Sequence, residues 1–97
     1  MAEFQRYVAD MVIERCFQDE TVPEVMMLFL EECGEMAKAA RNQLKTVKSD
    51  EKSEKLHLES EVADIFMYLL IICNKFGVDL EKAFRDKEEL NKIRKWK

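Results

Sequence analysis

The chain has 97 residues, which suits one domain and leaves too little mass for two separate cores, so we expect residues 1–97 to form a single domain. Its 47% hydrophobic and 37% charged residues are typical of a folded soluble protein, and its net charge of −4 argues against a binder of nucleic-acid polymers, which needs a basic face. With two glycines, one proline and many good helix formers, the composition favours an all-α fold.

The N-terminal segment is predicted to form an amphipathic helix over roughly residues 2–18. Apolar side chains recur there at spacings of three or four residues, from Phe4 to Val12. Residues 19–23 then break the pattern, and Asp19 or Thr21 is suited to cap the helix that follows.

Two longer helices are predicted after this break. The first of them runs from about Pro23 to about Leu44, and a polar connection of mixed charge follows over residues 45–55. The next helix runs from about Ser53 to Phe76 and overlaps the end of this connection. Gly77 then supplies the left-handed residue that commonly ends a helix.

The last element and the apolar pattern together predict how the helices pack. Asp79 is suited to cap a fourth helix over about Leu80 to Arg94, which completes a four-helix bundle-like subunit. Residues 25–30 and 62–73 are apolar on nearly all sides of their helices, so they need partners all round that a chain of this size cannot supply. We therefore expect a homo-oligomer, at least a dimer, with these helices at its centre.

Three observations predict a cytoplasmic protein that does not cross a membrane. Cys16, Cys33 and Cys73 form no CxxC pair and lie in apolar stretches, as reduced core cysteines do. The N-terminus lacks the basic-then-apolar order of a signal peptide. The longest apolar run, residues 62–73, is interrupted by Asp64 and is too short to span a bilayer.

Two pairs of acids form the chemically informative pattern. Glu32 and Glu35 lie three residues apart in one predicted helix, and Glu61 and Asp64 do so in the next, so each pair shares a helix face. Both pairs border apolar stretches, where acids are costly unless they are compensated. If the two helices pack antiparallel, the pairs can meet, and each contact at about 4 Å costs on the order of 4 kcal/mol at an effective dielectric near 20. A hard cation such as Mg²⁺ would neutralise such a site and could activate a water.

Three other interpretations remain open at this point. A single ExxE on a helix is most often a solvated face. A di-iron bundle also gathers helix carboxylates, but it normally needs two Glu-x-x-His motifs, and this chain has one histidine, His57. A catalytically weak nucleotide-binding module or a helical adaptor would be the non-enzymatic alternative.

The sequence resembles a known family at these acids. Residues 31–35 (EECGE) and 61–64 (EVAD) resemble the EExGE…ExxD signature of the MazG-like, all-α nucleoside triphosphate pyrophosphohydrolases. The resemblance continues through residues 64–70, 77–80 and 87–94, so it covers roughly residues 23–94. The chain departs from many relatives at its end, where it reads NKIRKWK in place of a run close to NRRRYP.

The resemblance implies an activity and a set of site residues. It implies hydrolysis of a (deoxy)nucleoside triphosphate to a monophosphate and pyrophosphate, in the house-cleaning of non-canonical or surplus nucleotides. It implies Mg²⁺, with Mn²⁺ as a substitute, held by Glu32, Glu35, Glu61 and Asp64, while Glu31 orients the attacking water. Lys87, Asn91 and Arg94 match positions used near the triphosphate, and Lys38, one turn beyond Glu35, could add a further positive charge. Relatives assemble as dimers or tetramers with pockets at subunit contacts.

Overall fold

The computed structural model describes the backbone of residues 1–44 and 51–94 and the side chains of all of these except residues 51–56. This part of the chain holds four helices and no strand: α1 (Ala2–Glu14), α2 (Val22–Leu44), α3 (Glu51–Lys75) and α4 (Leu80–Ile93). The all-α prediction is confirmed. Most of the predicted polar connection, residues 45–50, and the terminal residues 95–97 lie outside the described residues.

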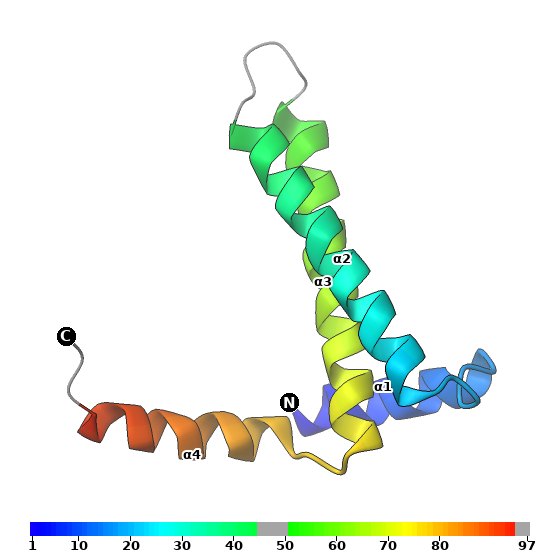
Figure 1. Ribbon diagram of the computed structural model, residues 1–97, viewed down its shortest axis with the longest axis vertical. Coiled ribbons are helices and arrows are strands. Elements are labelled where there is room, and N and C mark those ends of the chain that lie inside the picture. The colour runs from blue at the N-terminus through cyan, green and yellow to red at the C-terminus, as the bar shows by residue number, and fades with distance from the viewer. Residues whose placement is uncertain (45–50, 95–97) are drawn as a thin grey trace.

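The arrangement is a long hairpin with two shorter helices at its base (Figure 1). The helices α2 and α3 run antiparallel side by side, and α1 packs against α3 near the base of this hairpin. The helix α4 leaves the base in another direction and extends away from the hairpin. It buries none of its residues. A four-helix bundle is therefore not formed within one chain, because α4 does not lie alongside the other three helices.

The small core lies where α1, α2 and α3 meet. It consists of apolar side chains that are buried almost completely: Val8, Met11, Val25, Leu70 and Ile71. Val8 and Met11 lie three residues apart and therefore share a face of α1, while Leu70 and Ile71 are consecutive residues of α3. Phe4 packs its ring edge-to-face on Phe66 with centroids 5.7 Å apart, yet it stays 58% exposed. The core thus leaves much apolar surface uncovered in a single chain.

The start of α2 is set by a capping box, one of the two caps that the sequence offered. The Thr21 hydroxyl accepts a hydrogen bond from the Glu24 backbone N–H at 3.3 Å, and the Glu24 carboxylate accepts from the Thr21 N–H at 3.4 Å and from its hydroxyl at 2.9 Å. At α4 the Asp79 carboxylate accepts from the Lys82 backbone N–H at 3.1 Å, which confirms the predicted cap.

The end of α1 differs from its prediction. The helix was expected to reach about residue 18 but ends at Glu14, because Cys16 adopts a left-handed conformation with φ of 59°. The Phe17 N–H donates to the Val12 carbonyl at 2.8 Å and the Cys16 N–H donates to the Ile13 carbonyl at 3.1 Å, which is a Schellman motif. Cys16 is exposed rather than in the core. Phe17 is therefore part of a turn and not of the helix.

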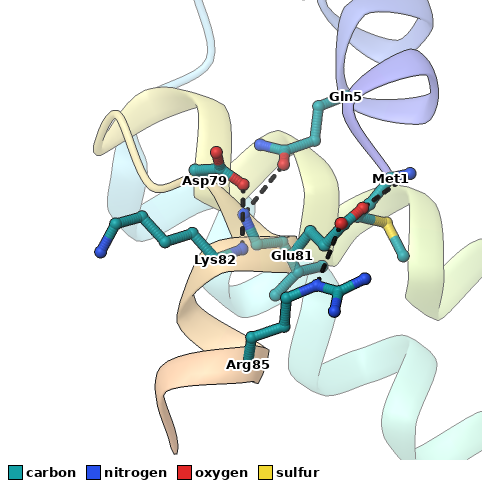
Figure 2. A network of polar contacts seen from close by, with 7 residues as sticks. Met1, Gln5, Asp79, Glu81, Lys82 and Arg85 are labelled. Carbon is teal, nitrogen blue, oxygen red and sulfur yellow. Dashed lines mark hydrogen bonds and ion pairs between the residues drawn. The ribbon is translucent and has the colours of Figure 1, made fainter.

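The α3–α4 turn has the same motif with the expected residue. Gly77 has φ of 66°, and the Val78 N–H donates to the Cys73 carbonyl at 2.8 Å. The Gln5 side chain of α1 then holds this turn, because its amide donates to the Val78 carbonyl at 2.8 Å. Its oxygen accepts from the Leu80 N–H at 2.9 Å (Figure 2). Gln5 and Asn74 also exchange hydrogen bonds of 3.1 and 2.9 Å. These bonds fix the direction in which α4 leaves.

The two left-handed residues support a matched pair of stability predictions. Cys16→Gly should stabilise the fold by about 1 kcal/mol, because glycine adopts a positive φ without the steric cost that a Cβ imposes. Gly77→Ala should destabilise it by about the same amount for the same reason. Thermal unfolding followed by circular dichroism measures both. Shifts of the same sign would contradict the assignment of strain to these two residues.

None of the helices in the described part of the chain is long and apolar enough to cross a membrane. All three cysteines are free thiols: Cys16 is exposed, Cys33 is partly buried and Cys73 is buried.

Candidate metal centre

Three of the four predicted acids meet on the α2–α3 hairpin. Glu32 comes from α2, while Glu61 and Asp64 come from adjacent turns of α3, and one carboxylate oxygen of each lies within 4.8 Å of the others. We call these three residues the acid cluster. All three are partly buried. The antiparallel pairing of α2 and α3 brings them together, since each residue lies on the face that its helix turns toward the other.

The electrostatics of the acid cluster are those of a site that lacks positive charge. The pKa of Glu32 is raised, first by its hydrogen bond to the Glu61 carboxylate, then by burial and by the charges of Glu61, Asp64 and Glu31. The Oε2 atom of Glu61 is buried and has no hydrogen-bond partner among the described residues. The single histidine, His57, lies with its Nε2 3.9 Å from Oε1 of Glu61 and is largely exposed.

This donor set fits a hard divalent cation. Carboxylate oxygens are the ligands that Mg²⁺ and Mn²⁺ prefer. A cation among the three acids would give the Glu61 oxygen a partner and would offset the repulsion that raises the pKa of Glu32. Soft metals and iron are disfavoured, because the cluster contains neither cysteine nor a Glu-x-x-His pair.

The raised pKa of Glu32 gives a stability prediction with a definite sign. A carboxyl whose pKa is higher in the folded state favours folding while it is protonated, and this contribution is lost as the pH rises through the unfolded value, 4.5, and the higher folded value. Without divalent cations, Glu32→Gln should therefore raise the melting temperature at pH 7 and change it little well below pH 4.5. Thermal unfolding in EDTA at the two pH values tests this. An equal gain at both would attribute the effect to packing instead of charge.

The other predicted residues of α2 lie outside the acid cluster. Glu35, the fourth predicted ligand, is exposed and is not among the three acids that meet. Glu31 is exposed, and its charge acts on Glu32. Lys38 is also exposed, one turn beyond Glu35 on the same helix.

The three residues predicted to lie near the triphosphate are on α4 and are not brought to the acid cluster within one chain. Lys87 and Arg94 are exposed, and Asn91 is partly buried with an Oδ1 atom that has no hydrogen-bond partner in the described part of the chain. The helix α4 extends away from the hairpin that carries the acid cluster.

A pocket that the sequence did not predict lies beside the acid cluster. A cavity of about 200 Å³ lies between the end of α1, the turn after it and α3, and Asp64 forms part of its wall. We call it the side pocket; its other polar or aromatic walls are Arg15, Phe17, Glu20 and Tyr68. The pKa of Tyr68 is raised by burial and then by the charges of Glu20, Glu32 and Asp64, so Tyr68 lies between the pocket and the cluster.

The sequence indicates only some of the residues that line this pocket. Tyr68 could have been found, because it lies four residues after Asp64 and therefore on the same face of α3. Phe17 and Glu20 could not have been found, because the predicted first helix continued to residue 18 and would have placed Phe17 in the helix instead of in the turn.

Comparison with models of known protein families identifies a domain in this chain. Residues 20–95 match the family model described as the MazG nucleotide pyrophosphohydrolase domain. The matched range includes α2, α3 and α4 and therefore the whole acid cluster, while α1 lies outside it. A search of curated proteins finds no match to the chain.

Proposed function

The chain belongs to the MazG nucleotide pyrophosphohydrolase domain family, and from this premise we propose that it hydrolyses a (deoxy)nucleoside triphosphate to the monophosphate and pyrophosphate, with Mg²⁺ as cofactor. The observation that carries the proposal is the acid cluster of Glu32, Glu61 and Asp64, which gathers three carboxylates on apolar helices and leaves one of their buried oxygens without a hydrogen-bond partner in the described part of the chain. The proposed role is the removal of non-canonical or surplus nucleotides in the cytoplasm, and the free thiols of the chain are consistent with a reducing compartment.

In the proposed reaction, the acid cluster holds the cation and Glu35 approaches as a fourth ligand from the same face of α2. When bound, Mg²⁺ polarises a phosphoryl oxygen and lowers the pKa of a water. Glu31, which lies next to Glu32 on α2, orients the attacking water and accepts its proton. The half-buried position of the acid cluster keeps its electrostatic interactions strong, because less water screens them than at an exposed site.

The charge of the substrate requires cations in addition to the metal, and the hairpin provides few. Lys38 is available on α2 beyond the acids. The other residues predicted near the triphosphate are the cations Lys87 and Arg94 and the neutral amide Asn91, all on α4, which points away from the acid cluster of its own chain. We therefore assign these three residues to the triphosphate bound by a second copy.

Uncovered apolar surface supports such an assembly. Side chains on all four helices are exposed although they are large and apolar, including Tyr7 (65%), Met27 (70%), Val62 (49%), Phe84 (69%) and Ile93 (81%). An open apolar cavity of about 510 Å³ also lies between α1 and α3, lined by Phe4, Tyr7, Phe66 and Leu70 among others. Patches of this kind mark association surfaces in folded proteins. The proposed state is a homo-oligomer, either a dimer or a tetramer.

Pyrophosphate release tests the proposal directly. In Mg²⁺, the purified chain should release pyrophosphate from at least one member of a panel of canonical and modified nucleoside triphosphates. It should release less in buffer to which neither Mg²⁺ nor Mn²⁺ is added, and none in EDTA. Inorganic phosphate without pyrophosphate would indicate cleavage of a different bond. Tight nucleotide binding without turnover across the panel would overturn the enzymatic proposal and favour a binding module.

A further inference from the structure

The side pocket and the acid cluster share a wall. Asp64 belongs to both, and Tyr68 lies one turn further along α3 in the pocket. A nucleotide whose phosphates are held at the acid cluster therefore has a partly open pocket next to it for its other end. The cavity of about 200 Å³ is below the roughly 300–1,000 Å³ of pockets that enclose a whole drug-sized ligand, so it suits a single flat ring system.

The walls of the side pocket are built in place before any ligand arrives. The left-handed Cys16 ends α1 and directs the chain into the turn that carries Phe17. The Glu20 N–H donates to the Phe17 carbonyl at 3.1 Å, and the Lys75 ammonium of α3 donates to the Glu20 carbonyl at 2.8 Å. The turn is thus fixed at both ends, and preorganised groups lose less entropy when they bind.

The apolar part of the pocket suits a base. Phe17 and Tyr68 contribute aromatic rings, and Met11, Met67 and Ile71 complete the apolar wall. Phe17 is 41% exposed, which leaves part of its ring available for stacking. Stacking on aromatic rings accepts every base, because each base has a π-face, so these residues alone do not discriminate.

The polar part of the pocket does discriminate. Glu20 is partly buried, and at neutral pH a carboxylate only accepts hydrogen bonds. Arg15 is exposed, so water screens its charge more strongly than that of Glu20. Glu20 therefore gives the edge of the pocket an acceptor, where an amino group of a base is favoured and a carbonyl is opposed.

Resting on the proposed function, we propose that the side pocket binds the nucleobase and that Glu20 selects bases with an exocyclic amino group, such as cytosine and adenine, over their carbonyl counterparts uracil and hypoxanthine. Glu20 is in this case a specificity-determining residue, and Phe17 is a stacking residue without base preference.

Two matched substrate pairs test this proposal, CTP with UTP and ATP with ITP, because each pair keeps the ring and exchanges an amino group for a carbonyl. The wild-type chain should prefer the amino member of each pair in kcat/KM by about ten-fold or more, since a buried polar group left without its partner costs at least this factor. In Glu20→Gln the ratio should fall close to one, because an amide both donates and accepts. The control Asp19→Asn removes the same charge from the neighbouring residue, which does not line the pocket, and should keep the wild-type ratio.

A second variant separates stacking from selection. Phe17→Leu should raise KM for all four nucleotides while both ratios stay unchanged, because stacking is lost equally for every base. A wild-type preference for UTP or ITP, or an unchanged ratio in Glu20→Gln, would overturn the proposal.

The failure of the proposed function would give a different result. If no nucleotide releases pyrophosphate, calorimetric affinities for the same four nucleotides in Mg²⁺ replace kcat/KM, with the same variants and the same expected ratios. Equal affinities for CTP and UTP and for ATP and ITP would then reject the role of Glu20, independently of catalysis.

Discussion

Glu61→Gln should lower kcat for pyrophosphate release by at least about 10²- to 10³-fold, the range expected when one charge-stabilising group is lost from a catalytic site. The replacement keeps the shape of the side chain but removes the negative charge, and its amide hydrogens would point at the place of the cation. Glu61 is the member of the acid cluster with a buried oxygen that has no partner among the described residues, so it has the most to lose. Asp64→Asn should have the same effect.

A structural explanation of such a loss can be excluded by two measurements. Removing one of three repelling charges should leave the melting temperature in EDTA unchanged or higher, because the acid cluster is destabilising without a cation. Mg²⁺ should raise the melting temperature of the wild-type chain, since a ligand of the folded state stabilises it, and should do so much less in Glu61→Gln.

Glu59→Gln is the matched control: this acid is exposed two residues earlier on α3, and its loss should leave both the activity and the melting temperature unaltered. Full activity of Glu61→Gln would remove it from the metal site.

The acid cluster was predictable because it depends on two local rules. Acids three residues apart share a helix face, and two long helices joined by a short connection pair antiparallel. Neither rule requires knowledge of the rest of the chain. The cap at Asp79 and the stop at Gly77 are equally local, and both are where the sequence indicated. The role of Glu35 as a fourth ligand stays a prediction, since Glu35 lies exposed beside the three acids that meet.

Two features of the fold could not be predicted from local sequence rules. The end of α1 depends on a left-handed cysteine, a conformation that β-carbon sterics disfavour, so nothing in the sequence marks Cys16 as a stop. The direction of α4 depends on Gln5, whose partners Asn74, Val78 and Leu80 lie 69 to 75 residues away along the chain. The periodicity of α4 predicts an apolar face but does not say what covers it. No residue of α4 is buried in the described part of the chain, so one chain does not form the four-helix bundle-like subunit that was expected.

The direction of α4 leads to a second strong prediction, which concerns two variants with strongly reduced activity. Lys87→Ala should lower kcat/KM by about 10²-fold, as expected when a charge-assisted contact to a phosphate is lost in a water-poor site. If the α4 of one copy serves the acid cluster of another, an oligomer of Lys87→Ala and Glu61→Gln subunits contains one site in which all the acids and Lys87 are intact. Mixing the two variants under conditions that exchange subunits should therefore restore activity that neither shows alone.

The outcome distinguishes sites formed between copies from sites formed within one. Were α4 to fold back onto the acid cluster of its own chain, every site in the mixed oligomer would carry one of the two defects, and mixing would restore nothing. A mixture of Glu61→Gln with Asp64→Asn is the matched control: both residues belong to the acid cluster of one hairpin, so it should stay inactive in either case. Light scattering of each variant verifies that the assembly survives, which is expected because Lys87 is exposed and none of the side chains of α4 is buried. Restored activity in the first mixture alone would mean that the charge of the triphosphate is balanced by two subunits, with the acids from one copy and the cations from the other.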